Sequence, residues 1–372
     1  MLTIETTRRE LSGALAKVKP FVPGRCPLPV LSGVRMSAEG GRLVLEGTDL
    51  ERRIRLTTGI PAEGDAVLVR FKGLASTLTG VPAKDPVQLS STETGMSVRV
   101  NGSAWQVEGL ELADWPAIPS YGLLPDAGPM LPAKPLLEAM GRVVYACSTD
   151  QQRPVLTGIL LEPGAATNLQ SGKTVAAATD SYRLALTTAE VSGLAGPILF
   201  PGRAVKALAG LDLDTFRVDV VDGKEVILAG ADAVVWVRLI EGQFPKYRSL
   251  IPTGKPVLTW HPGDGLVATL RQLAKVNADY PVRFDFGSNI MRVQVNGSDS
   301  FSAAIPGTWE GELPDFIGFN SSFLADALES IGDAGSVSFF DQKKPVLASG
   351  AGVVHSVVWG AGVSGLIMPV RV

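Results

Sequence analysis

The chain repeats one order of helices and strands three times along its 372 residues. Amphipathic stretches with apolar residues at helical spacing recur at 8–19, 133–144 and 265–276. Each stretch precedes a segment that reads as extended and carries a Pro-Val pair, and these pairs begin at Pro29, Pro154 and Pro281. The offsets of 125 and 127 residues between the pairs define the length of the repeat. A repeat of this length predicts three tandem domains.

Each copy continues with segments in which apolar and polar residues alternate, as in half-buried strands. Two of these strands end in a Thr-Asp pair, Thr48-Asp49 and Thr179-Asp180. A second, shorter helix is predicted in every copy, at 71–79, 202–209 and 320–331. The pattern predicts an α+β fold, in which each domain combines two helices with antiparallel sheet. Proline- and glycine-rich linkers place the domains at 1–122, 123–253 and 254–372.

The sequence carries few residues that could support catalysis or metal binding. Cys26 and Cys147 lie far apart outside any CxxC motif, and His261 and His355 have no nearby ligand partner. The repeated Thr-Asp pair reads as a turn or cap, and no nucleotide-binding or nucleophile motif is present. We therefore expect no enzyme activity, no metal and no cofactor. No secretory leader and no membrane-length apolar run is found, which predicts a cytoplasmic protein.

Basic residues are concentrated on the predicted helices, although the net charge of the whole chain is −3. The six helices hold eleven lysine and arginine residues against four acidic ones. An ordinary solvated helix face would account for some of this excess. The single sign of the bias also fits a local surface that meets phosphates while the rest of the protein stays acidic.

Several runs are specific enough to identify a family. The chain contains PLPVLSGVRMSAEGGRLVLEGTDLE, RPVLTG followed by ATDSYRLAL, QFPKYRSLIP, GFN-SSF and a terminal IMPVRV. Together these resemble the bacterial beta sliding clamp family over the whole chain. The resemblance implies a non-catalytic processivity factor of DNA polymerase III, with helices inside and sheets outside a six-domain ring of two subunits. Its partners would be duplex DNA, the polymerase catalytic subunit, the ATP-dependent clamp loader and other clients with short hydrophobic motifs.

Helix dimensions independently favour a ring of two subunits. Six helices about 10 Å thick close on a circle that leaves about 8 Å clear. Duplex DNA is on the order of 20 Å across, so one chain cannot encircle it. Twelve helices leave about 27 Å clear, which admits DNA with a layer of water. Contacts through water would be weak, salt-sensitive and blind to sequence.

The resemblance implies a client-peptide site between domains two and three. Its positions here are Leu156, Thr179, Ser181, Tyr182, Arg183, Leu184, Pro245, Ser249, Leu250, Tyr280, Asn320, Phe323, Val346, Ile367, Met368, Pro369, Val370 and Arg371. Aliphatic, aromatic and methionine side chains suit an apolar peptide, and a few polar groups would orient it. Some of these residues, such as Leu184, could instead belong to the core.

The resemblance also implies two further surfaces. DNA contacts carry over to Arg25, Lys72 and Arg203. The subunit interface carries over to four positions in domains one and three: Trp105, Val107, Ala274 and Lys275.

The chain departs from common family members at several of these places. Ser181-Tyr182 replaces a Gly-His pair in the peptide site, and Pro154-Val155 replaces an aromatic pair that can meet DNA. Gly102 and Ala104 replace interface arginines, and the helix at 320–331 has no basic residue. These departures leave an alternative open: a clamp-like client-peptide-binding module, or a duplicate or drug-insensitive copy that does not serve the main polymerase.

Overall fold

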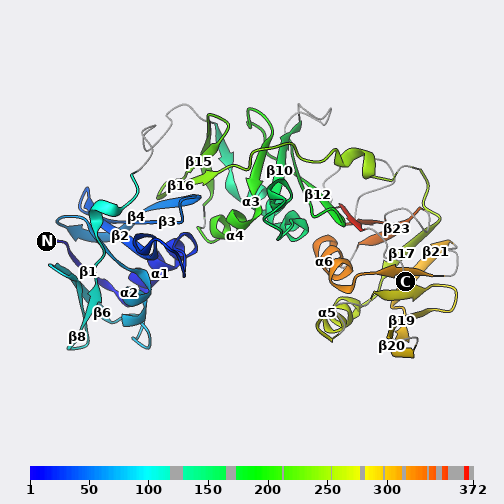
Figure 1. Ribbon diagram of the computed structural model, residues 1–372, viewed down its shortest axis with the longest axis horizontal. Coiled ribbons are helices and arrows are strands. Elements are labelled where there is room, and N and C mark those ends of the chain that lie inside the picture. Colours follow the sequence, from blue (N-terminus) through cyan, green and yellow to red (C-terminus); the bar gives the residue numbers. More distant parts are fainter. Residues whose placement is uncertain are drawn as a thin grey trace. The chain divides into compact units, whose positions relative to one another are not determined.

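The computed structural model describes residues 1–117, 129–164, 173–211, 213–252, 254–276, 281–295, 298–311, 316–332, 335–340, 346–350 and 364–367. The chain divides into two compact units. The first unit comprises Met1–Lys134 and Lys206–Leu239, and the second comprises Pro135–Val205 and Ile240–Val372. Figure 1 labels the elements of both units along the chain.

The six α-helices in the described ranges lie where the repeat predicts them. They are α1 (Arg8–Val18), α2 (Phe71–Thr77), α3 (Ala133–Val143), α4 (Gly202–Ala209), α5 (Leu266–Val276) and α6 (Ser321–Ile331). A capping box starts α1, in which the Thr7 side chain accepts from the Glu10 N–H and the Glu10 side chain accepts from the Thr7 N–H. Among the described residues, no helix is long and apolar enough to cross a membrane.

The first unit contains one antiparallel sheet of twelve strands. The strands are β1 (Thr3–Thr7), β2 (Gly33–Glu39), β3 (Arg42–Thr48), β4 (Arg52–Glu63), β5 (Val67–Arg70), β6 (Pro86–Thr92), β7 (Gly95–Val100), β8 (Ser103–Glu108), β9 (Met130–Pro132), β14 (Thr215–Val221), β15 (Glu225–Ala229) and β16 (Ala233–Arg238). The main path runs β8-β7-β6-β1-β4-β16-β15-β14-β9. The long strand β4 pairs with β1, β3 and β16, so it joins strands of the first repeat to strands of the second.

The second unit contains a nine-stranded and a four-stranded sheet, again antiparallel. The larger has the order β13 (Ile198–Pro201), β10 (Gly158–Pro163), β11 (Thr174–Thr179), β12 (Arg183–Ala189), β25 (Ser364–Ile367), β24 (Val346–Ser349), β23 (Ser336–Phe339), β17 (Leu258–Pro262), β21 (Gly307–Gly311). The smaller has the order β20 (Ser298–Ala304), β19 (Ile290–Val295), β18 (Val282–Asp285), β22 (Ile317–Phe319). Pairing of β12 with β25 joins the second repeat to the third.

Two of the three Pro-Val segments differ from the extended conformation that the sequence predicts, whereas the third leads from Pro281 directly into β18 as predicted. Pro29–Ser32 and Pro154–Thr157 each form a 3₁₀ turn before the strand begins. In both turns the hydroxyl of the last residue donates to the carbonyl of the proline, at 2.6 and 2.7 Å. Proline fixes φ near the helical value, and the hydroxyl closes the turn. The strands that follow start at Gly33 and Gly158.

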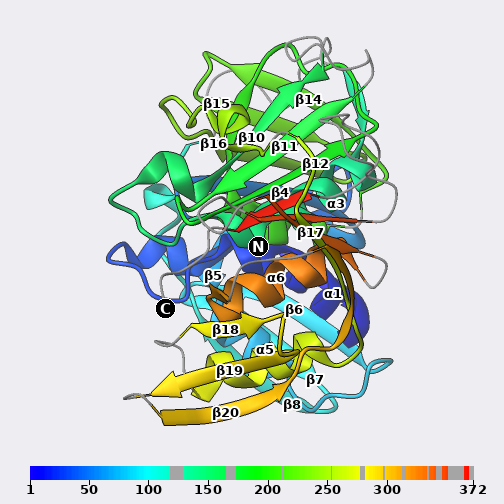
Figure 2. The same ribbon diagram turned by 90° about the vertical axis from the view of Figure 1, so that its right-hand side faces the viewer.

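An aromatic cluster forms the core of the third repeat. Trp260, Phe284, Phe286, Phe319 and Phe339 are each at most 6% exposed. Neighbouring rings in the cluster lie 5.5–6.2 Å apart, with tilted or edge-to-face geometries except for the stacked pair Phe284–Phe286. Helices α5 and α6 lie side by side next to this core (Figures 1 and 2), and α6 also contacts β24 and β25. Asp326 on α6 accepts a hydrogen bond from Arg183 on β12 of the preceding repeat.

Candidate functional site

A tight turn between β11 and β12 exposes Tyr182, whose side chain is 61% accessible. The Thr179 hydroxyl donates to the Arg183 carbonyl at 2.7 Å and accepts from the Ser181 N–H at 3.2 Å. Asp180 Oδ1 accepts from the N–H groups of Tyr182 and Arg183 at 2.9 and 3.0 Å. Ser181 has a φ of 82°, the left-handed region that favours glycine. Four side-chain hydrogen bonds therefore hold the strained turn in place.

The guanidinium of Arg183 lies at the centre of the site. Its Nε donates to Asp180 Oδ2 at 3.0 Å, and its Nη1 donates to Asp326 Oδ2 on α6. The same guanidinium stacks on Phe323 at 4.3 Å and on Tyr145 at 5.3 Å from the ring centroids. The Arg183 side chain is only 12% exposed, so these contacts are weakly screened by solvent.

The ion pairs continue from Arg183 to the other helix of the third repeat. Asp326 Oδ1 also accepts from Arg271 on α5 at 2.6 Å, and Arg271 binds Glu329 at 2.6 Å. The hydrogen bond to Arg271 lowers the pKa of Glu329 below its usual value. One chain of alternating charges therefore runs through five side chains, which we call the ion-pair network: Asp180, Arg183, Asp326, Arg271 and Glu329. It connects the β11–β12 turn to both α5 and α6.

Phe323 supports the exposed tyrosine of the turn. Asn320 caps α6 by accepting the Phe323 N–H at 3.2 Å, which fixes the first turn of the helix. The rings of Tyr182 and Phe323 lie 6.4 Å apart at 33°. Ser181-Tyr182, the departure from the family pattern, therefore places an aromatic side chain over the Arg183–Phe323 stack.

A second segment of the candidate site follows the second repeat. Pro245, Ser249 and Leu250 are exposed, Leu250 to 52%, on and next to the 3₁₀ turn Tyr247–Leu250. Tyr247 is buried and donates to Glu162 on β10 at 2.7 Å. Burial and this hydrogen bond raise the pKa of Tyr247, so the phenol stays neutral. Tyr247 anchors the segment to the sheet that carries the β11–β12 turn.

Other predicted peptide-site residues lie below the surface or outside the described chain. Leu156, Leu184 and Val346 are 8%, 2% and 0% exposed, so they form packing beneath the site. Ile367 lies on β25, opposite Arg183 and Val346 in the strand register. The remaining predictions fall outside the described residues: Tyr280, Met368, Pro369, Val370 and Arg371.

Tyr145, Arg271 and Asp326 were absent from the predicted site. Asp326 lies 143 residues from Arg183 in the sequence, and no local pattern links such distant positions. Its helix was singled out because it carries acidic and no basic residues. The structure explains that departure, since arginines from other elements bind both acids of α6.

The predicted DNA contacts are exposed. Arg25 lies shortly before the 3₁₀ turn Pro29–Ser32, and Lys72 lies in the first turn of α2. Both residues belong to the first unit. Arg203 lies in the first turn of α4 and belongs to the second unit.

The predicted interface residues occupy an edge strand and a helix. Trp105 is 40% exposed on β8, an end strand of the twelve-stranded sheet. Val107 on the same strand is 4% exposed, close to the Cα position of Gly73 in α2. On α5, Ala274 is half-buried and Lys275 is exposed. Trp105 and Lys275 are therefore the members of the set that present accessible side chains.

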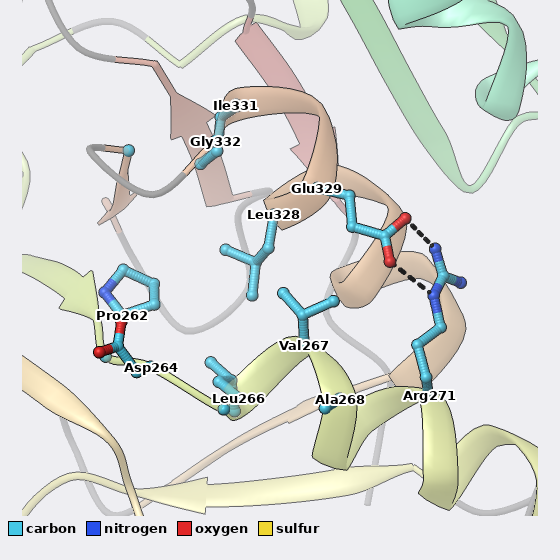
Figure 3. A pocket seen from close by; sticks show the side chains of 13 residues that line it. Pro262, Asp264, Leu266, Val267, Ala268, Arg271, Leu328, Glu329, Ile331 and Gly332 are labelled. Atoms are coloured by element: carbon cyan, nitrogen blue, oxygen red, sulfur yellow. Dashed lines mark hydrogen bonds and ion pairs between the residues drawn. The ribbon is translucent and has the colours of Figure 1, made fainter.

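A hollow of about 610 Å³ opens between the start of α5 and the end of α6. Its apolar lining includes Leu266, Val267, Leu328 and Ile331, and the Arg271–Glu329 ion pair borders it (Figure 3). None of the predicted site residues lines this hollow. Because Asp264 and Glu329 add negative charge to its lining, the hollow is a poor match for DNA phosphates.

Two family models match the chain over most of its first two repeats. The DNA polymerase III beta subunit N-terminal domain matches residues 2–119, and the central domain of the same subunit matches residues 130–246. A beta sliding clamp from Streptomyces coelicolor is 29% identical over 394 residues, covering 100% of this chain and 99% of that protein. One from Staphylococcus aureus is 25% identical and covers 97% and 96%.

Solved structures show the same fold. The Caulobacter crescentus beta sliding clamp, with polyethylene glycol at a putative beta-motif tethering region, has a TM-score of 0.84 at 23% identity, covering 100% and 99% of the chains. The Bartonella birtlesii clamp bound to griselimycin has a TM-score of 0.84 at 24% identity, covering both chains completely. The full-length similarity to sliding clamps favours that function over the alternative of a clamp-like module or second copy.

Arg183→Lys tests whether the planar guanidinium holds the site together. Lysine keeps the charge, but it cannot bind Asp180 and Asp326 through separate nitrogens or stack flat on Phe323. We expect the free energy of unfolding to fall by about 1–3 kcal/mol, measured by urea denaturation. The exposed Arg142→Lys on α3 is the matched control and should change it by less than about 0.5 kcal/mol. Equal stability of the two variants would contradict a structural role for Arg183.

Proposed function

The chain belongs to the bacterial beta sliding clamp family, the non-catalytic processivity subunit of DNA polymerase III, and on this premise we propose where it binds its clients and DNA. It acts as a DNA sliding clamp, a ring that retains the polymerase on its template. The observation that carries the client-site proposal is the exposed Tyr182 stacked near Phe323 above the ion-paired Arg183. Because the clamp acts on bacterial DNA, we place it in the cytoplasm.

The proposed client site takes a short apolar peptide. Tyr182 and Leu250 supply exposed apolar surface, and Asn320 with Ser181 and Ser249 supplies polar groups around it. A peptide that buries two or three large apolar side chains gains roughly 1.5–3 kcal/mol from each. Ordering costs then leave an affinity near micromolar. Such an affinity lets clients exchange, while the ring on DNA keeps their effective concentration high.

We propose domain boundaries at 1–122, 123–253 and 254–372. The two family-model matches end at 119 and begin at 130, which supports a boundary between them. The repeated order of two helices and antiparallel strands supports the same division. With these boundaries, the client site lies where the second domain meets the third.

We propose that β8 of one subunit meets α5 and β20 of the other. Both β8 and β20 end their sheets in the described part of the chain, so each has an edge available for pairing. Trp105 on β8 gives this edge a large exposed apolar side chain, and Ala274 and Lys275 on α5 complete the proposed contact. With few interface charges, the association is mainly apolar.

Retention on circular DNA tests the sliding function. A ring held by topology should remain on closed circular DNA and run off linear DNA, and direct binding should fade as salt rises. Lys72→Glu should weaken loading because it puts a negative charge on the proposed DNA face. Lys224→Glu, on the exposed β14–β15 turn, makes the same charge change away from the helices and should load normally. Equal retention on linear and circular DNA would exclude the topological mechanism.

Sedimentation tests the proposed interface. Wild-type protein should be a dimer at micromolar concentration, with little dependence on salt because the contact is mainly apolar. Trp105→Ala removes the exposed indole and should raise the dimer dissociation constant at least tenfold. Met130→Ala removes a more exposed apolar side chain from β9 and serves as the control. A Trp105→Ala protein that dimerises as tightly as wild type would refute this assignment.

Peptide affinity tests the client site. A Gln-Leu-Ser-Leu-Phe peptide should bind near micromolar, as measured by calorimetry. Tyr182→Ala and Met368→Ala should each cost at least tenfold, about 1.4 kcal/mol, with little change in thermal midpoint. Leu28→Ala removes an exposed apolar side chain next to the Pro29–Ser32 turn and should leave affinity unchanged. No binding by wild type at hundreds of micromolar would refute the site.

A further inference from the structure

The β11–β12 turn of the client site has a counterpart within the first unit, between β3 and β4. There the Thr48 hydroxyl donates to the Arg52 carbonyl at 2.9 Å and accepts from the Leu50 N–H at 3.1 Å. Asp49 Oδ1 accepts from the N–H groups of Glu51 and Arg52, and Asp49 Oδ2 binds Arg52 Nε at 3.0 Å. Leu50 has a φ of 73°, close to the 82° of Ser181. Every hydrogen bond that the Thr179 and Asp180 side chains make within the client-site turn is therefore repeated.

The strands around the two turns also correspond. Arg52 and Arg53 pair with Val237 and Trp236 on β16. The equivalent residues Arg183 and Leu184 pair with Ile367 and Leu366 on β25. In sequence, Trp115-Pro116 occupies the place of Phe244-Pro245 after each repeat. The junction of the first two repeats thus has the framework of the client site.

One substitution changes the chemistry of the first junction. Arg53 takes the place of the buried apolar Leu184, and it is itself only 6% exposed. Its Nη1 donates to the Ala117 carbonyl at 2.9 Å, and its Nη2 donates to the Pro116 carbonyl. A hollow of about 100 Å³ remains beside it, lined also by Thr48, Leu50 and Trp236. A water molecule occupies about 30 Å³ of liquid, so the hollow has room for a small polar group.

Two buried donors beside this hollow have no partner among the described residues. They are Arg53 Nε and the indole Nε1 of Trp236, which is 3% exposed. Buried N–H groups without an acceptor are rare in folded proteins. Both residues line the hollow, so an acceptor placed there could serve them.

The charges around the hollow favour a neutral acceptor. Glu51 and Glu225 line it together with Arg52 and Arg53, and Asp49 is ion-paired to Arg52 at 2.6 Å. Three carboxylates thus accompany two guanidinium groups, so an anionic ligand such as phosphate gains little from the local field. An amide carbonyl supplies a strong acceptor without adding charge.

We propose that the first junction holds a second ligand site, which takes the amide carbonyl of a partner's peptide segment. The comparison of this second site with a client pocket rests on the proposed function. The unpaired donors and the hollow are observed independently of that function. A client that already binds at the second junction could place a further stretch of its chain here.

Indole resonances test this site directly. In ¹⁵N-tryptophan-labelled full-length protein, N-acetylalanine methylamide should shift the Trp236 Nε1–H resonance in a saturable way. Trp260, whose indole already donates to the Pro306 carbonyl at 3.0 Å, should stay unshifted. Acetamide tests a free amide and acetate tests an anion. A Trp236 shift that saturates with N-acetylalanine methylamide, and weaker binding of acetamide, would support a peptide segment as the ligand. Preference for acetate, equal or tighter binding of acetamide, or no shift selective for Trp236 would overturn the proposal.

Arg53→Leu tests the contribution of the unpaired donor while keeping the Thr-Asp turn. It removes the unpaired Nε and restores the residue type of Leu184, so peptide-amide affinity should fall at least tenfold. Arg42→Leu, at an exposed position on β3, is the matched control. An unchanged affinity in folded Arg53→Leu would overturn the proposal, and if that variant fails to fold, the wild-type titration decides alone. Failure of the Gln-Leu-Ser-Leu-Phe peptide to bind, with the Trp236 shift intact, would refute only the client site.

Discussion

The ion pairs of Arg183 are the contacts on which the proposed client site in the second unit depends. One guanidinium binds Asp180 in its own turn and Asp326 on α6, and it stacks on Phe323 and Tyr145. Through Asp326, the ion-pair network reaches Arg271 and Glu329. Removing one partner would leave a shielded charge uncompensated, which costs more than the pair itself contributes. The network therefore specifies how the turn and the two helices of the third repeat are held.

A turn repeated in the first and second repeats supports different chemistry at each place. The Thr-Asp framework and a residue in the left-handed region recur at Thr48–Arg52 and Thr179–Arg183. At one junction the turn exposes Tyr182 above an apolar floor that includes Leu184. At the junction of the first two repeats, Arg53 takes the buried position that Leu184 has in the second repeat. There, the N–H groups of Arg53 Nε and Trp236 Nε1 have no acceptor among the described residues. Backbone-directed hydrogen bonds can keep a turn while the outward side chains change, because the framework uses only the Thr and Asp side chains.

The sequence was sufficient for the six helices, the α+β class and the repeat, because these follow from local periodicity and recurring order. It also marked the turn around Tyr182, because ATDSYRLAL is specific to the family. It did not predict the pairing of Arg183 with Asp326 or the stacking on Tyr145, since these contacts depend on how distant elements pack. The Pro-Val segments at Pro29 and Pro154 form 3₁₀ turns and not the predicted extended structure, because a serine or threonine hydroxyl three residues later closes back on the proline carbonyl. The segment at Pro281 is extended, as predicted.

We propose that client peptides bind around Tyr182 and Phe323, on the surface that the Arg183 contacts hold in place. Hydrogen–deuterium exchange with and without a saturating apolar client peptide would locate binding without a variant. We predict slower exchange in 179–184, in 244–251 and at the start of α6, with no change in the β14–β15 turn at 221–225. Protection confined to other segments, such as the hollow between α5 and the end of α6, would contradict it.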